Sequence, residues 1–168
     1  VAVDGLAVPK SGAFATPLGS IPLDVAAIAR LAELPQVVFS DHAHAQEHSL
    51  EVHLPFLQRV LDEFTLVPLA VGHATPRDVA EVLDLLWGGP ETLIVISSDL
   101  SHFLPYAAAN LTDRDTCQHI LQLDTHIRPE QACGAYPVNG LLLAARQRGL
   151  VPQLLHRCNS GDTAGDKQ

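Results

Sequence analysis

The apolar run from Thr92 to Ile96 constrains the fold more than any other feature of this sequence. Gly88, Gly89 and Pro90, which end regular structure, come before it, and polar residues follow it. A short continuous apolar run between such signals is typical of a strand that is buried on both faces. Strands of this kind occur in sheets that helices cover on each side. The run therefore predicts an α/β protein.

The rest of the chain alternates between strand and helix patterns. Strands are predicted at residues 1–8, 36–39, 64–71, 92–96 and 150–157, and helices at residues 23–34, 76–87, 105–123 (interrupted near 110–112) and 138–148. Asp24 and Thr75 are expected to cap the helices at 23–34 and 76–87, because their side chains can accept an N–H of the first turn. Residues 9–22 are expected to form an extended loop or hairpin, and residues 159–168 a loop. This order favours a single domain, residues 1–168, with a mostly parallel sheet flanked by helices.

Residues 40–57 carry an unusual density of groups that titrate near neutrality or ligate metals. They are His42, His44, His48, His53, Glu47 and Glu51. Leucines at positions 50, 54, 57 and 61 predict one helix with an apolar stripe, bent at Pro55, while His44, His48 and Glu51 share another face that would line a pocket. The alternative is a set of solvated surface side chains. The order Glu-His-x-x-Glu excludes the zinc metalloprotease motif.

Composition and charge narrow the class of protein. With 168 residues, 47% of them apolar and 17% charged, the chain is long enough for a sizeable core and is not disordered. A net charge of −9 without a basic run argues against nucleic acid as a partner. No apolar stretch approaches eighteen residues, so we expect no membrane span. Three cysteines without a Cys-x-x-Cys pair, and no signal-peptide pattern, favour a reducing cytoplasm.

Polar residues follow the run 92–96, at the end of a sheet strand where α/β proteins place their sites. Asp99 can orient the imidazole of His102, or the two can act together in proton transfer. Alternatively, Asp99 caps the next turn. Cys133 precedes a predicted helix, where a thiolate is stabilised and can act as a nucleophile or a metal ligand. A buried inert thiol is an equal alternative. No Gly-x-Ser-x-Gly, Rossmann or P-loop pattern occurs.

Five segments, in order along the chain, resemble the Memo family, whose bacterial and archaeal members are called AmmeMemoRadiSam system protein B. They are Thr16–Gly19, Glu47–Phe56, Ser97–His102, Cys133-Gly134-x-x-Pro137 and Asn159–Thr163. The resemblance implies a fold similar to the class III extradiol dioxygenases, which bind non-haem iron. It also implies a metal held by two histidines and the cysteine that matches Cys133, with His48, Asp99 and His102 in the surrounding pocket.

The two metal-binding histidines of the family have no match in these 168 residues. We therefore expect a domain that is incomplete at both ends, a fragment also suggested by the absence of methionine. The leading hypothesis is a Memo-like protein whose intact form binds iron, or alternatively copper or zinc, and carries out dioxygenase-like oxidative chemistry. The alternative is a non-catalytic module that binds a peptide or small molecule, in signalling or beside a radical SAM partner and an AMMECR-type protein.

Both hypotheses depend on one spatial expectation. His48, Asp99, His102 and Cys133 are distant in sequence, and we expect them to converge at a single cavity at the edge of the sheet.

Overall fold

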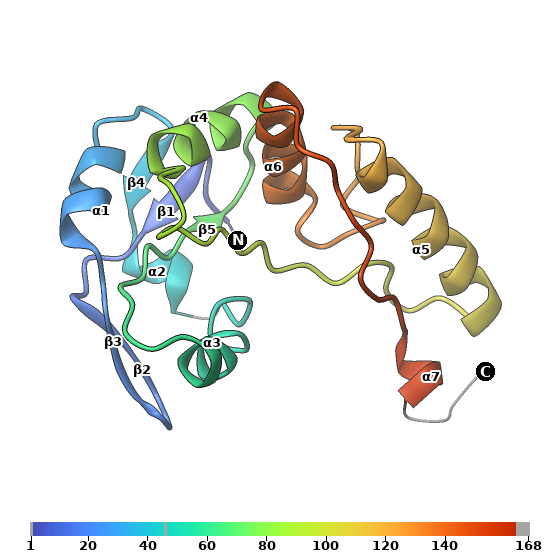
Figure 1. Cartoon of the computed structure of the whole chain (residues 1–168), viewed down its shortest axis with the longest axis horizontal. Helices are drawn as coiled ribbons and strands as arrows, with labels where there is room; N and C mark the ends of the chain where they lie inside the picture. The colour runs from blue at the N-terminus through green and yellow to red at the C-terminus, as the bar shows by residue number, and fades with distance from the viewer. Residues whose placement is uncertain (1, 46, 164–168) are drawn as a thin grey trace.

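The computed structural model describes residues 2–45 and 47–163. Val1, Gln46 and residues 164–168 lie outside that description, and with them the first position of the expected strand 1–8 and the end of the expected loop 159–168. The described residues form an α/β arrangement, as predicted, in which short strands lie beside helices (Figure 1). The helices that the structure describes are all too short or too polar to cross a membrane.

The main sheet has three strands in the order β4 (Val37–Phe39), β1 (Leu6–Val8) and β5 (Ala70–Val71). β1 pairs with β4 in parallel and with β5 in antiparallel fashion. The sheet is therefore mixed, and the expectation of a mostly parallel sheet is met only in the β1–β4 pair. All three residues of β1 are buried, which fits a central strand.

Gly5 allows β1 to enter the sheet. Its φ of +90° lies in the left-handed region that side chains disfavour. A Cβ at this position would lie only 2.1 Å from the carbonyl oxygen of Gln36. The same carbonyl accepts the N–H of Leu6 at 2.8 Å, just before β1 and β4 begin to pair. The sheet thus depends on a residue without a side chain at this point.

The segment predicted as a loop or hairpin is a hairpin. β2 (Ala13–Thr16) and β3 (Gly19–Pro22) pair in antiparallel fashion around a two-residue turn. Figure 1 shows this hairpin extending away from the main sheet. Its inner face contributes Ile21, which is 2% exposed.

Both predicted helix caps are present. Asp24 Oδ1 accepts the N–H of Ala27 at 2.9 Å at the start of α1 (Val25–Leu31). Thr75 and Asp78 form a reciprocal capping box at the start of α4 (Pro76–Leu86), with Pro76 in the first turn. These starts are local in sequence, which is why the sequence predicts them well.

The carboxyl-terminal half contains α5 (Tyr106–Leu121), α6 (Ala135–Gln147) and the short α7 (Ser160–Thr163). The interruption expected near residues 110–112 is absent. Asn110 instead donates its side-chain amide to the carbonyl of Tyr106, one turn earlier, at 3.0 Å, so it stays compatible with the helix.

The prediction of one bent helix through the histidine-rich stretch is wrong. The structure has α2 (Asp41–His44), then turns, then α3 (Leu54–Val60). Pro55 lies in the first turn of α3, where a missing N–H costs nothing, so it begins a helix and does not bend one. His44, His48 and Glu51 consequently do not share a helical face.

The predicted strands at 92–96 and 150–157 are also wrong for this structure. Neither segment is a helix or a strand, and no backbone hydrogen bond among the described residues pairs residues 93–97 or 151–157 with another segment. Leu93 is 63% exposed and Leu155 86%. Figure 1 shows one segment crossing from α4 to α5 and the other descending from α6 to α7. The predicted strand 64–71 is reduced to β5 and one bridge at Leu66.

The principal core lies between the main sheet and helices α1 and α4. Its buried residues include Leu6, Val8, Ile28, Leu31, Val79 and Val82. A second, smaller core lies beneath α6 and contains Ile127, Ala132, Ala135 and Leu142. Helices α4 and α6 pack closely, and Gly140 of α6 meets Val79 of α4. This helix pair links the sheet to the carboxyl-terminal half.

Replacement of Gly140 by alanine tests that packing. A Cβ at position 140 would lie 2.3 Å from Val79 Cβ, so Gly140→Ala should destabilise by about 1–3 kcal/mol through overpacking. In a helix without such a neighbour, replacement of glycine by alanine raises the free energy of unfolding by up to about 1 kcal/mol. The sign of the change therefore shows whether Gly140 packs against Val79. Chemical denaturation measures it. Gly12→Ala, where a Cβ would have no neighbour within 4 Å, is the control and should change stability by less than about 0.5 kcal/mol.

Candidate functional site

The loop before α6 docks onto the polar segment that follows residues 92–96. The N–H of Cys133 donates to the carbonyl of Asp99 at 3.2 Å, and the N–H of Asp99 in turn approaches Cys133 Sγ at 3.2 Å. Ser98 Oγ accepts the N–H of Gly134 at 2.9 Å and lies 3.8 Å from the sulfur. Four contacts thus fix the thiol against Ser98 and Asp99. We call Ser97–Asp99 with Cys133 and Gly134 the cysteine cluster.

Gly134 makes this close approach possible. A Cβ there would lie 2.6 Å from the carbonyl oxygen of Ser97 and 2.8 Å from Ser98 Cβ. Contacts under 3.0 Å would force the two segments apart. Glycine at position 134 is therefore a steric requirement of the cluster, while Cys133 beside it is exposed.

Asp99 and His102 lie next to each other at the cluster, but their contact is loose. His102 Nε2 is 3.8 Å from Asp99 Oδ2, and the Asp99 side chain is 87% exposed. Solvated pairs of this kind contribute little to stability. Among the residues that the structure describes, the Asp99 carboxylate pairs with His102 and does not cap α5, which starts after Pro105. A solvated carboxylate and imidazole are groups that can exchange protons with a bound molecule.

His53 is a site residue that the sequence analysis did not select. Its Nε2 lies 2.9 Å from Ser97 Oγ, and the pair is partly buried. This contact joins the start of α3 to the cysteine cluster. The sequence showed only that His53 belongs to a histidine-rich stretch, and nothing in its spacing identified Ser97 as its partner.

His48 is not brought into contact with the cluster. Its Nδ1 lies 2.6 Å from Glu51 Oε1, and both side chains are largely exposed. His44 has a structural role, because its Nε2 bonds the carbonyl of Ala7 in β1 at 2.9 Å and its ring packs edge-on against Phe14. The catalytic role expected of His48 stays a prediction.

A complete metal site is not formed by the described residues. Within residues 2–45 and 47–163, no group of three or more His, Cys, Asp or Glu side chains is arranged to hold an ion. Cys133 offers one accessible sulfur, Cys158 is exposed elsewhere, and Cys117 is buried. Burial raises the pKa of the Cys117 thiol, which suits a structural residue.

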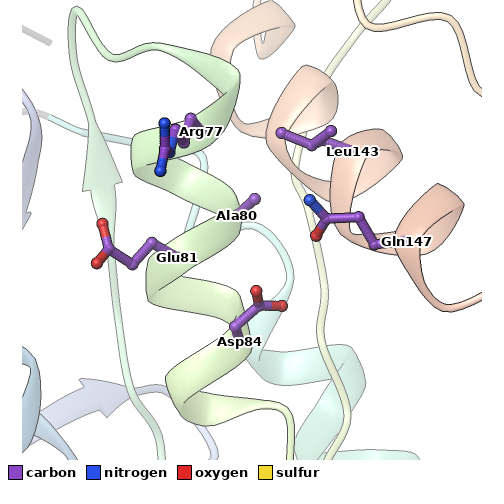
Figure 2. A pocket seen from close by; sticks show the side chains of 6 residues that line it. All are labelled: Arg77, Ala80, Glu81, Asp84, Leu143 and Gln147. Atoms are coloured by element: carbon purple, nitrogen blue, oxygen red, sulfur yellow. The ribbon is translucent and has the colours of Figure 1, made fainter.

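Two hollows among the described residues are lined by side chains from outside the cysteine cluster. One, of about 290 Å³, is a groove between α4 and α6. Figure 2 shows its lining side chains, which are Arg77, Ala80, Glu81, Asp84, Leu143 and Gln147. The other, of about 250 Å³, lies beside residues 2–4 and His73. Neither hollow is lined by any of the four residues expected to converge; the contacts present are those of Cys133 with the Asp99 backbone and of the Asp99 carboxylate with His102.

A second group of titratable side chains lies at the carboxyl end of α5. One carboxylate, Asp124, receives His126 Nδ1 at 2.6 Å and His119 Nδ1 at 2.7 Å. These two hydrogen bonds, His126 first, hold the pKa of the Asp124 carboxyl below its usual value. Its geometry closes the chain reversal after α5, where Leu123 has a φ of +55°.

The described residues combine an α/β fold with a polar cysteine cluster that follows residues 92–96. Sequence comparison identifies the family of proteins to which the chain belongs. The family model described as Memo-like protein matches residues 1–168. The chain belongs to the Memo family.

Curated relatives agree with this assignment. A MEMO1 family protein of Sulfolobus acidocaldarius is 34% identical over 93% of this chain and 60% of the relative. One from Methanothermobacter thermautotrophicus is 33% identical over 97% of this chain and 64% of the relative. One from Metallosphaera sedula is 30% identical over 93% and 60%. The chain thus spans less than two thirds of the length of the relatives it matches.

Replacement of His53 tests its contact with the cysteine cluster. His53→Ala should lower the free energy of unfolding by about 1 kcal/mol and shift the amide NMR signals of Ser97 and Asp99, because a partly buried hydrogen bond is lost. His53→Gln, which keeps a polar end group, should retain most of both. His42→Ala, at an exposed position nearby, is the control. Unchanged cluster signals in His53→Ala would show that the contact is not made in solution.

The Asp124 group predicts a specific loss of stability in acid. A carboxyl whose folded pKa lies below its unfolded value of about 3.9 stabilises the fold above that pH. This contribution is lost as the pH falls from there through the folded pKa. Denaturation curves at several pH values should show a smaller acid loss for Asp124→Asn than for the parent chain. Exposed Asp62→Asn is the control, and equal behaviour of the two variants would contradict the assignment.

Proposed function

We propose that this chain provides the cysteine ligand of a redox metal site in a Memo-family protein. Cys133 is the ligand, and Asp99 and His102 are the groups that exchange protons with a bound substrate. The observation that carries the proposal is the exposed Cys133, whose sulfur is held by the Asp99 N–H at 3.2 Å, with the Asp99 carboxylate in turn 3.8 Å from the His102 imidazole.

Iron is the metal we favour, with copper or zinc as alternatives. A thiolate suits each of these ions, and two further imidazoles would complete a site with open positions for a substrate. The described residues do not supply those imidazoles. In this proposal they are two histidines from outside residues 1–168, in a protein of the length of the curated relatives. When bound, iron or copper would supply the oxidative chemistry of a dioxygenase-like oxidoreductase, whereas zinc, which is not redox-active, would act only as a Lewis acid.

The resemblance to AmmeMemoRadiSam system protein B supports a place for the intact protein in that system. Its partners in this proposal are a radical SAM protein and an AMMECR-type protein, and its substrate is a small molecule or peptide. Membership of the Memo family supports this proposed placement. The family assignment itself would stand if the placement were wrong.

Sulfur ligation separates the metal hypothesis from a binding module without a metal. Co²⁺ at saturating concentration should give a thiolate-to-cobalt charge-transfer absorption with the 168-residue chain. Binding should be weak, because one protein ligand replaces three. The absorption should persist in Cys158→Ser, which removes the other exposed thiol, and disappear in Cys133→Ser. An absorption that survives in Cys133→Ser, or none in the parent chain, would contradict the proposal and favour a peptide or small-molecule binding module.

A further inference from the structure

We propose that Asp113 is a positioning residue of the candidate site. Its buried carboxylate holds the backbone between Asp99 and His102, and so sets where these two side chains lie relative to each other. The inference rests on the proposed function only for the role of Asp99 and His102 in proton exchange. The contact itself and its test involve no metal.

The contact joins α5 to the segment that carries the site. Asp113 Oδ1 accepts the backbone N–H of Ser101 at 2.9 Å, and Asp113 is only 4% exposed. Ser101 lies between Asp99 and His102 in the sequence. The hydrogen bond therefore acts on the backbone midway between the two side chains of the candidate site.

The two side chains give each other little support. The Asp99 side chain is 87% exposed and the His102 side chain 42%, and His102 Nε2 lies 3.8 Å from Asp99 Oδ2. A pair that is so well solvated is held only weakly by its own attraction. The relative position of the two groups is therefore set by the backbone that carries them.

Different contacts hold the two halves of this backbone. Among the described residues, the hydrogen bonds that reach residues 97–99 from elsewhere in the chain come from the Cys133–Gly134 loop and from His53. In the same part of the chain, residues 100–102 are reached by the Asp113 carboxylate, which binds Ser101, while Leu100 packs against the second core. The cysteine cluster thus anchors Asp99, and Asp113 anchors the backbone that leads to His102.

The backbone directly after His102 is strained, so it needs such an anchor. Phe103 has a φ of +56°, a conformation that is unfavourable for a bulky residue. Its side chain is fully exposed and lies beside the His102 ring, so burial does not offset the strain. A conformation of this kind persists only where the surrounding contacts enforce it. The hydrogen bond at Ser101, two residues earlier, is one such contact.

A carboxylate is a costly choice for a contact that only fills space. Among the described residues, the Ser101 N–H is the hydrogen-bond partner of the Asp113 side chain, and no Lys, Arg or His forms an ion pair with it. Burial of a carboxylate without a cation costs more than burial of an amide or an apolar group. In return, an ionised carboxylate forms a hydrogen bond roughly twice as strong as a neutral acceptor does. The choice of residue favours a firm hold on one N–H.

Nuclear magnetic resonance of the 168-residue chain tests the proposal. The parent chain should show a scalar coupling across the hydrogen bond, between the Ser101 nitrogen and the Asp113 Cγ. It should also show a nuclear Overhauser cross-peak between the Asp99 β protons and the His102 ring. Asp113→Ala should abolish both signals. The cross-peaks between Asp99 and Cys133, and those between Gly140 and Val79, should persist in that variant.

Matched variants separate positioning from a structural role. Asp113→Asn keeps an acceptor oxygen and should retain the Asp99–His102 cross-peak. Asp115→Ala removes an exposed carboxylate from the same helix and should leave every signal of the site unchanged.

The proposal is wrong if the parent chain lacks the Ser101–Asp113 coupling, or if Asp113→Ala keeps the Asp99–His102 cross-peak. It is also wrong if Asp113→Asn loses that cross-peak, or if Asp113→Ala loses the Gly140–Val79 cross-peaks as well, which would make Asp113 a structural residue. A parent chain without the Co²⁺ absorption would instead contradict the proposed function, and the placing of Asp99 and His102 by Asp113 would stand.

Discussion

The contact between the Cys133–Gly134 loop and the Ser97–Asp99 segment is the constraint on which the candidate site depends. It joins two stretches that lie more than thirty residues apart, and it leaves no room for a Cβ at position 134. Hydrogen bonds in both directions between Cys133 and Asp99 fix the sulfur relative to the backbone. The Asp99 carboxylate and the His102 imidazole belong to the same segment, so the position of this backbone also sets the positions of these two side chains.

Two other contacts hold this cluster to the rest of the molecule. Gly140 lets α6, which follows the Cys-Gly pair, pack against Val79 of α4 and hence against the principal core. His53 reaches Ser97 from the start of α3. The main sheet packs against α4, and α4 in turn packs against α6.

The sequence predicted best what local interactions determine. The Asp24 and Thr75 caps, the hairpin, the strands at β1 and β4 and the end of α6 follow from nearby side chains and from Gly and Pro positions. The predictions from the sequence failed where the burial of a segment depends on residues far away in the chain. The run 92–96 looks like a buried strand, but strand pairing requires a neighbour, and the described residues provide none. Pro55 was equally ambiguous, because the same residue bends a helix or begins one.

The same distinction between local and distant interactions applies to the residues of the candidate site. Motif order predicted that Asp99, His102 and Cys133 would lie together; the structure brings the Asp99 backbone to Cys133 and the Asp99 carboxylate to His102, and their common role stays a prediction. His48 was selected because it matches a pocket histidine of the family and was expected to share a helix face with Glu51; its ring pairs with Glu51, and its catalytic role stays a prediction. His53 escaped selection because its partner, Ser97, is 44 residues away. Membership of the Memo family is shown by comparison over the whole chain, whereas metal binding and catalysis rest on the proposal made above.

The presence of the cysteine cluster in solution is the central claim, and nuclear Overhauser spectroscopy tests it most directly. The Asp99 nitrogen lies 3.2 Å from Cys133 Sγ, so the Asp99 amide proton and the Cys133 β protons should give a clear cross-peak. Contacts between Gly140 and Val79 serve as the internal reference for a folded chain. The account predicts both sets of cross-peaks. Reference cross-peaks without the Asp99–Cys133 contact would contradict it.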